Sequence, residues 1–275
     1  MDLWQAALLG LVEGLTEYLP VSSTGHLILV QRALGLEASA AHNAFAICIQ
    51  AGAIAAVALL YRERILQMLR GLAGSEPAGR RLMLRVVAAF VPAAVLGKLF
   101  DEQIEAFLFG LWPVVAAWAV GGVVILFVAR RRRSFHPLQG KTLEELSLGG
   151  AFAIGLVQCL AMWPGTSRSL ATILGGLGLG LALPAALEFS FLLGLVTLGA
   201  ATAYKGVKDG GTMVSELGLG ALALDFLVAA ASAWASVRWM VSYLERRGLA
   251  LFGWWRLALA ALIAGLLASG TWEAR

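Results

Sequence analysis

Two carboxylates near the start of the chain are spaced for joint chemistry. Glu13 and Glu17 are four residues apart, so a helix would place both side chains on one face. Two like charges in apolar surroundings are costly, and a bound divalent cation would relieve that cost, because carboxylate oxygens suit Mg²⁺ or Ca²⁺. A wet vestibule with one carboxylate protonated is the alternative. We favour the metal or substrate role.

A proline-led turn follows these acids and carries a serine and a histidine. Pro20 should end the first helix, and Ser22 or Ser23 could cap the next one. A helix start offers unpaired N–H groups that bind phosphate. Because His26 lies three residues after Ser23, the two side chains can share a face for base-assisted attack or proton delivery. A capping serine and a hydrogen-bonded histidine would be the purely structural reading.

A second turn of this kind lies in the other half of the chain and carries an arginine. The segment 164–169 ends in Ser167, Arg168 and Ser169, and Thr172 lies one helical turn further on. Arg168 is the one charged residue between Glu145 and Glu188, and its planar fork suits a phosphate. It could instead extend to a membrane surface. If the two turns meet, the combined groups suit phosphoryl transfer.

The two turns belong to an internal repeat. The first copy carries one extra residue, Leu19, before its proline. After the prolines, one spacing of 144 residues relates Pro20 to Pro164, Ser23 to Ser167 and Phe45 to Phe189. Agreement at separated points predicts a duplication, with repeats 1–130 and 146–275 in a single membrane domain.

The composition places these groups in a bilayer. Of the 275 residues, 60% are hydrophobic and only 14% charged, against about 25% charged in a soluble domain. Segments 42–61, 106–129 and 146–167 contain no Asp, Glu, Lys or Arg, and runs of this length can cross a membrane. The net charge of +4 comes from basic residues in short loops, as expected of a membrane protein, and the hydropathy excludes a soluble or nucleic-acid-binding role.

The predicted fold is an all-α polytopic membrane protein with an inverted-topology repeat. It has six transmembrane helices and two re-entrant helical hairpins, 3–35 and 146–183, which meet near the midplane. With basic loops in the cytoplasm, helices run alternately inward and outward. The predicted spans are 42–60, 82–100, 107–129, 185–204, 221–244 and 252–270, with an acidic turn at 101–105 and a mixed turn at 205–216.

Several polar residues within the spans have a structural interpretation. We expect Asp225 near the outer end of its helix, and Arg85, Arg238 and Arg256 extending to the inner surface. Cys48 and Cys159 are expected to be small buried hydrophobic residues without a disulfide or metal role.

At its two turns the chain resembles the undecaprenyl-pyrophosphate phosphatase family of the bacitracin-resistance type. The first family motif matches Glu13-Gly-Leu-Thr-Glu17-Tyr-Leu-Pro-Val-Ser-Ser23-Thr-Gly-His26, and the second matches Pro164-Gly-Thr-Ser-Arg168-Ser-Leu-Ala-Thr172. Leu170 replaces the usual glycine, and a proline expected near Val196 is missing. These departures bear on packing and lipid preference and remove no reactive group.

The resemblance implies hydrolysis of undecaprenyl pyrophosphate to the monophosphate, which recycles the carrier for cell-wall polymers and confers bacitracin resistance. It implies a divalent cation, a place in the bacterial inner membrane and a possible homodimer. Glu13 and Glu17 would bind metal or pyrophosphate, and Ser23 and His26 are candidates for nucleophile or acid–base. The phosphate would be held by Thr24, Ser167, Arg168, Ser169 and Thr172.

A transporter or lipid flippase is the alternative, alone or combined with phosphatase activity. Inverted repeats with broken helices are typical of transporters, and Glu13 and Glu17 could be proton or cation sites. Release of phosphate by purified protein distinguishes the two classes.

Overall fold

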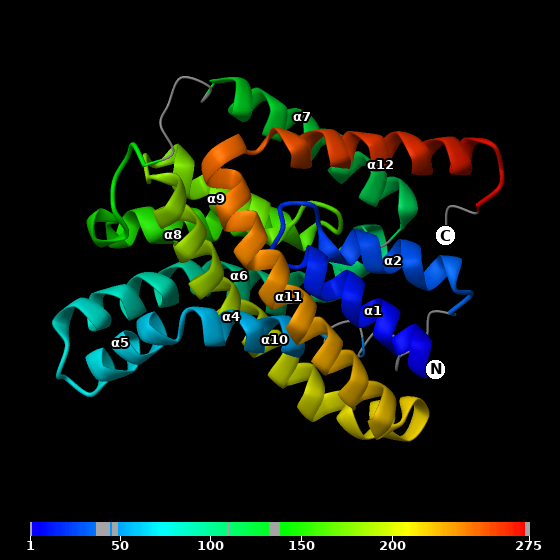
Figure 1. Cartoon of the computed structure of the whole chain (residues 1–275), viewed down its shortest axis with the longest axis horizontal. Coiled ribbons are helices and arrows are strands. Elements are labelled where there is room, and N and C mark those ends of the chain that lie inside the picture. Colours follow the sequence, from blue (N-terminus) through cyan, green and yellow to red (C-terminus); the bar gives the residue numbers. More distant parts are fainter. Residues whose placement is uncertain (1, 37–44, 46–48, 109, 132–137, 273–275) are drawn as a thin grey trace. The chain divides into compact units, whose positions relative to one another are not determined.

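The computed structural model describes residues 2–36, 45, 49–108, 110–131 and 138–272, and their regular structure is helical apart from one isolated bridge (Figure 1). Five helices are long and apolar enough to cross a membrane. They are contained in α6 (Pro77–Leu108), α7 (Leu111–Arg131), α10 (Leu183–Leu217), α11 (Leu219–Arg247) and α12 (Ala250–Ala268). The predicted all-helical, multi-pass membrane architecture is therefore confirmed at this level.

Two helix–turn–helix segments stand where the hairpins were expected. The first consists of α1 (Leu3–Thr16) and α2 (Ser23–Ala33), which pack against each other. The second consists of α8 (Leu148–Gln158), the 3₁₀ turn η2 (Cys159–Met162) and α9 (Arg168–Gly178). We call residues 17–22 the first turn and residues 163–167 the second turn.

The helix ends differ from several predicted boundaries. The acidic segment at 101–105 continues α6, and the segment at 205–216 continues α10. The latter helix ends only at Leu217, before Gly218, whose φ of 80° suits glycine. The expected loop 61–85 contains the amphipathic helix α5 (Arg62–Leu72), and the predicted span 42–60 is represented by Phe45 and α4 (Gln50–Leu60), because its other residues lie outside the described ranges.

The chain forms two compact units. Unit 1 comprises residues 1–19, 23–87 and 191–239. Small residues let its helices pack closely: a methyl group on Gly10 of α1 would lie 2.6 Å from the carbonyl oxygen of Asp225 in α11. The buried core of this unit includes Leu9, Leu27, Phe45, Ile49, Met213 and Leu217.

Unit 2 comprises residues 20–22, 88–190 and 240–275. Helices α7 and α12 lie side by side through Gly122 and Gly253, where a methyl group on either glycine would lie 2.9 to 3.1 Å from the backbone oxygen of the other (Figure 1). Helix α8 packs against α9 in the same unit. A backbone hydrogen bond holds the loop before α8 against the segment between α9 and α10: Ala182 N–H donates to Lys141 O at 2.9 Å.

Candidate active site

The two predicted carboxylates lie buried in unit 1 at the end of α1. Glu17 N–H donates to Glu13 O at 2.8 Å, so the helical turn that joins the two residues is formed. Glu13 is 0% exposed and Glu17 is 6% exposed. Helix α1 can be buried this deeply because Gly10 and Gly14 present no side chain to α11. Nearby, Ser236 Oγ donates to Leu15 O at 2.8 Å and fixes the end of α1 to α11.

Ser23 is bound to an acid of the first helix. The Ser23 hydroxyl donates a hydrogen bond to Glu17 Oε2, and both side chains are buried. This contact forms because α1 ends at Thr16, three residues before Leu19-Pro20, and the chain then turns back so that α2 begins at Ser23 itself. His26 lies one turn further along α2 and is half-buried, as is Thr24.

The second turn, in unit 2, organises hydroxyl groups around Arg168. Ser167 caps α9: its Oγ accepts from Leu170 N–H at 3.3 Å and lies 3.0 Å from Ser169 Oγ. Arg168 is the first residue of α9, and its Nη1 donates to Ser190 O at 3.0 Å. The Arg168 guanidinium is therefore directed toward the start of α10.

Ser190 is a site residue that sequence reasoning missed. Its Oγ lies 2.6 Å from Thr172 Oγ1, and Thr172 Oγ1 also donates to Arg168 O at 3.0 Å. Ser190 and Thr172 are both essentially inaccessible to solvent. A lone serine between two phenylalanines of an apolar span was the available signal, because a buried hydroxyl in such a span needs a hydrogen-bond partner.

Both turns contain a serine in the left-handed backbone region. The φ angles are 72° at Ser22 and 75° at Ser167, a conformation that costs side-chain-bearing residues free energy and is concentrated at functional sites. These serines are 145 residues apart, whereas the prolines are 144 apart. The helix starts that correspond in the structure are thus Ser23 and Arg168, so the two copies present a hydroxyl and a guanidinium at the same position.

The carboxylate pair fits a divalent cation held jointly by protein and substrate. The described residues contain no group of three or more His, Cys, Asp or Glu side chains that could hold a metal. Glu13 and Glu17 supply two buried carboxylates on one helical turn. This is the donor set expected for Mg²⁺, which commonly binds one or two carboxylates and takes its remaining oxygens from water and phosphate.

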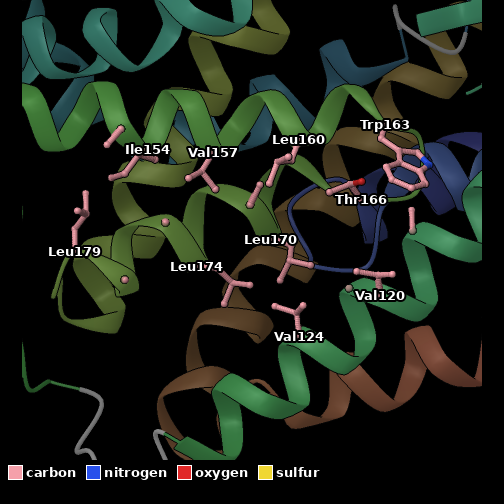
Figure 2. A pocket seen from close by; sticks show the side chains of 16 residues that line it. Val120, Val124, Ile154, Val157, Leu160, Trp163, Thr166, Leu170, Leu174 and Leu179 are labelled. Carbon is pink, nitrogen blue, oxygen red and sulfur yellow. The ribbon is translucent and has the colours of Figure 1, made fainter.

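An apolar cavity of about 600 Å³ opens beside the second turn in unit 2. Figure 2 shows that side chains of α7, α8 and α9 line it, with Trp163 and Thr166 at one end and Leu179 at the other. Thr166 and Leu170 line the cavity, and each lies two residues from Arg168 in sequence.

Two of the polar residues expected at membrane boundaries are buried. Arg256 was predicted to extend to the inner surface, and this prediction is wrong: its side chain is 0% exposed, because its donors bind three carbonyl oxygens inside unit 2. Asp225 is 2% exposed and packs against Gly10. Arg238, by contrast, is exposed and lies 4.7 Å over the Trp234 ring.

The structure thus builds two groups of predicted site residues. It joins Glu17 to Ser23 in unit 1, with Glu13 and His26 on the same two helices. It joins Arg168 to Thr172 and Ser190 in unit 2, with Ser167 and Ser169 alongside. The action of both groups on one ligand stays a prediction.

Comparison with known proteins shows similarity over nearly the whole chain. Residues 6–262 match the family model described as bacitracin resistance protein BacA. An undecaprenyl-diphosphatase of Sorangium cellulosum is 47% identical over 265 residues, which are 96% of this chain and 86% of the relative. Undecaprenyl-diphosphatase 2 of Rhodospirillum rubrum is 43% identical over 98% of this chain and 97% of its own length.

Proposed function

We propose that this chain, which belongs to the bacitracin resistance protein BacA family, hydrolyses undecaprenyl pyrophosphate to undecaprenyl phosphate and inorganic phosphate. The observation that carries the proposal is the family match over residues 6–262, together with relatives named undecaprenyl-diphosphatase. The reaction recycles the lipid carrier of cell-wall polymers in the bacterial inner membrane and confers resistance to bacitracin.

Arg168 and the start of α9 would hold the diphosphate. The bond from Arg168 Nη1 to Ser190 O orients the guanidinium, which carries five N–H donors in all. The N-terminus of α9 adds backbone N–H groups and a partial positive charge. Ser167, Ser169 and Thr172 place hydroxyls around this position, and Thr24 does so at the start of α2.

Glu17 and Ser23 would perform the transfer. The Ser23 hydroxyl gives its proton to Glu17 as its oxygen attacks the terminal phosphorus, a geometry that the existing hydrogen bond prepares. The bond from that phosphorus to the bridging oxygen breaks, and undecaprenyl phosphate leaves with the oxygen. Water then attacks the phosphorus of the serine phosphate and gives one proton to His26. The bond from phosphorus to the serine oxygen breaks, inorganic phosphate leaves, and the proton on Glu17 returns to the serine oxygen.

Glu13 and Glu17 would hold the divalent cation, Mg²⁺ or Ca²⁺. When bound, it would neutralise charge on the pyrophosphate oxygens. Both carboxylates belong to the helix turn that leads into Ser23, so the same segment provides cation ligands and the attacking hydroxyl.

The finer topology is part of the proposal: six spans and two re-entrant hairpins in inverted repeats 1–130 and 146–275, assembled as a homodimer. The short helices support re-entry. Helix α1 has 14 residues, whereas α2, α8 and α9 have 11 each. At 1.5 Å per residue, a 14-residue helix covers about 21 Å, less than the ~30 Å hydrocarbon core.

The polyprenyl tail would lie in the apolar cavity of unit 2. Thr166 and Leu170, each two residues from Arg168 in sequence, line the cavity, and its walls along α7, α8 and α9 are almost entirely apolar (Figure 2). A lipid whose diphosphate binds Arg168 could therefore place its first isoprene units against α9 without exposing them to water.

Phosphate release from undecaprenyl pyrophosphate by the detergent-purified protein tests the function. Wild type should release phosphate, and Glu17→Gln should lower kcat at least about 1,000-fold, because it removes a base and a cation ligand together. Glu63→Gln, an exposed position on α5, is the matched control and should keep wild-type turnover.

Ser23→Ala assayed in parallel should lose activity to a similar extent. Turnover by Ser23→Ala near the wild-type rate would assign the attack to water, and turnover by Glu17→Gln near the wild-type rate would remove the proposed site. A wild-type protein that transports lipid without releasing phosphate would be a transporter.

A further inference from the structure

We infer that Arg256 of α12 is a positioning residue that holds the first and second turns in register for catalysis. The inference rests on the proposed function. Arg256 is buried away from solvent, so it acts on the substrate only through the segments that it binds. Arg256 belongs neither to the predicted site residues nor to the two family motifs.

The guanidinium of Arg256 joins three separate parts of the chain. Its Nη1 donates to Pro20 O in the first turn at 3.4 Å, and its Nη2 donates to Gly165 O in the second turn at 2.7 Å. Nη2 also donates to Ala117 O of α7 at 2.9 Å. Among the described residues these carbonyls are its only hydrogen-bond partners, so the buried cation is neutralised by no carboxylate there.

The sequence of α7 makes room for this contact. The carbonyl of Ala117 faces the N–H of the residue four positions later, and that residue is Gly121. A methyl group at Gly121 would lie 2.7 Å from Arg256 Cζ and would overlap the Nη2 atom. Glycine at this position therefore lets the guanidinium reach a carbonyl on the face of an intact helix.

Two further contacts hold the first and second turns against α7. Trp118, a fully buried residue, donates from Nε1 to Val21 O in the first turn at 3.0 Å. Gly165 has φ 93°, and a methyl group on it would lie 2.8 Å from Val114 O, so the second turn also lies directly against α7. Arg256 thus completes a support that both turns share.

Each bound carbonyl lies close in sequence to a reactive group. Pro20 is three residues before Ser23, and Gly165 is three residues before Arg168. A displacement of about 1 Å in a catalytic group can cost ~100-fold in rate. Loss of the Arg256 contacts would therefore move the attacking hydroxyl and the phosphate-binding guanidinium relative to the substrate, although it removes no group that touches it.

The test is steady-state kinetics on Gly121→Ala and Arg256→Lys, with Gly265→Ala as the matched control. Gly121→Ala keeps the arginine and displaces it, whereas Gly265 is a helical glycine of α12 with open space around it. We expect kcat to fall at least about 10-fold in both test variants, with KM changed less than about 3-fold, because the geometry of attack is disturbed more than lipid binding. Gly265→Ala should match wild type.

The kcat of the double variant shows whether the two substitutions disturb the same contact. Gly121→Ala and Arg256→Lys act through one contact, so the double variant should be no slower than the slower single variant. Each protein is assayed as the monodisperse fraction from size-exclusion chromatography, which separates lost activity from lost folding. If neither variant yields such a fraction, Arg256→Gln, which removes the buried charge and keeps an amide donor in α12, is judged by the same kcat and KM criteria.

Wild-type kcat in the folded variants, or a fall that matches only the loss of folded protein, would overturn the inference. That outcome leaves the proposed function intact, provided that wild type releases phosphate and Glu17→Gln does not. Failure of wild type to release phosphate would instead refute the proposed function itself.

Discussion

At the scale of single residues, the members of the candidate site were easier to predict than the contacts that they make. The spacing of Glu13 and Glu17 correctly placed both on one helical turn, and Arg168 was singled out as the lone charge of its segment. The Ser23–Glu17 bond was not foreseen, because it depends on α1 ending three residues before the proline turn. Arg256 was misplaced, because hydropathy cannot distinguish a surface arginine from one whose donors find carbonyls in the interior.

Arg168→Lys tests whether the guanidinium fork itself contacts phosphate. Lysine keeps the charge but cannot bind Ser190 O and a phosphate in one plane, so kcat/KM should fall about 100-fold. The matched control is Arg238→Lys, on the exposed face of α11, which should retain wild-type kcat/KM. Values within about 3-fold of wild type for Arg168→Lys would show that Arg168 does not bind phosphate directly.

At the scale of elements, the helix–turn–helix pattern of each half could be predicted and its register could not. Prolines gave a spacing of 144 residues, but the second turn holds one more residue between its proline and its left-handed serine than the first turn does. Turn length is set by backbone geometry that side-chain types specify weakly. Helix α10 likewise runs through a segment expected to be a turn, since no proline interrupts it and Gly218 supplies the first left-handed break.

The cavity along α9 should govern the response to lipid length. Gly178 lines its far end, ten residues or about 15 Å beyond Arg168, and a side chain added there meets open space. Gly178→Phe should raise KM for the C55 substrate about tenfold, since losing contact with two methylene groups costs ~1.6 kcal/mol. KM for geranyl pyrophosphate, whose C10 tail stops short of this position, should stay within about twofold.

Gly265→Phe, which points into open space from α12, controls for the bulk of the new side chain. An equal rise in KM for both lipids would show that Gly178→Phe disturbs the phosphate end instead, and an unchanged KM for both would remove the tail from the cavity.

At the scale of the whole molecule, composition alone indicated a multi-pass membrane protein, and five long apolar helices agree with it. Orientation is a property of the chain in its membrane, and it follows from the basic residues between spans. The inverted arrangement of the two halves depends on the same argument and stays a prediction, as does the sixth span, part of which falls outside the described residues.

Labelling of single cysteines tests the predicted path through the membrane. In a background with Cys48 and Cys159 replaced, Ser75→Cys between α5 and α6 should lie in the cytoplasm, and Ser269→Cys after α12 should lie outside. A membrane-impermeant maleimide should therefore label only Ser269→Cys in intact spheroplasts and both variants after permeabilisation. Labelling of both in intact spheroplasts would contradict the path.

The carbonyl partners of Arg256 also constrain how the protein matures in the cell. Pro20, Ala117 and Gly165 are all translated before α12. When this helix carries Arg256 into the bilayer, the hydrogen-bond partners of the arginine have therefore already been synthesised. Inserting an arginine costs roughly 2.5–3.5 kcal/mol at the centre of a membrane helix and less toward its ends, and Arg256 is the seventh of the 19 residues of α12. We therefore expect helix α12 to insert stably only as Arg256 binds these carbonyl oxygens. A nascent chain that stops before residue 250 would contain both turns but would lack the arginine that joins them.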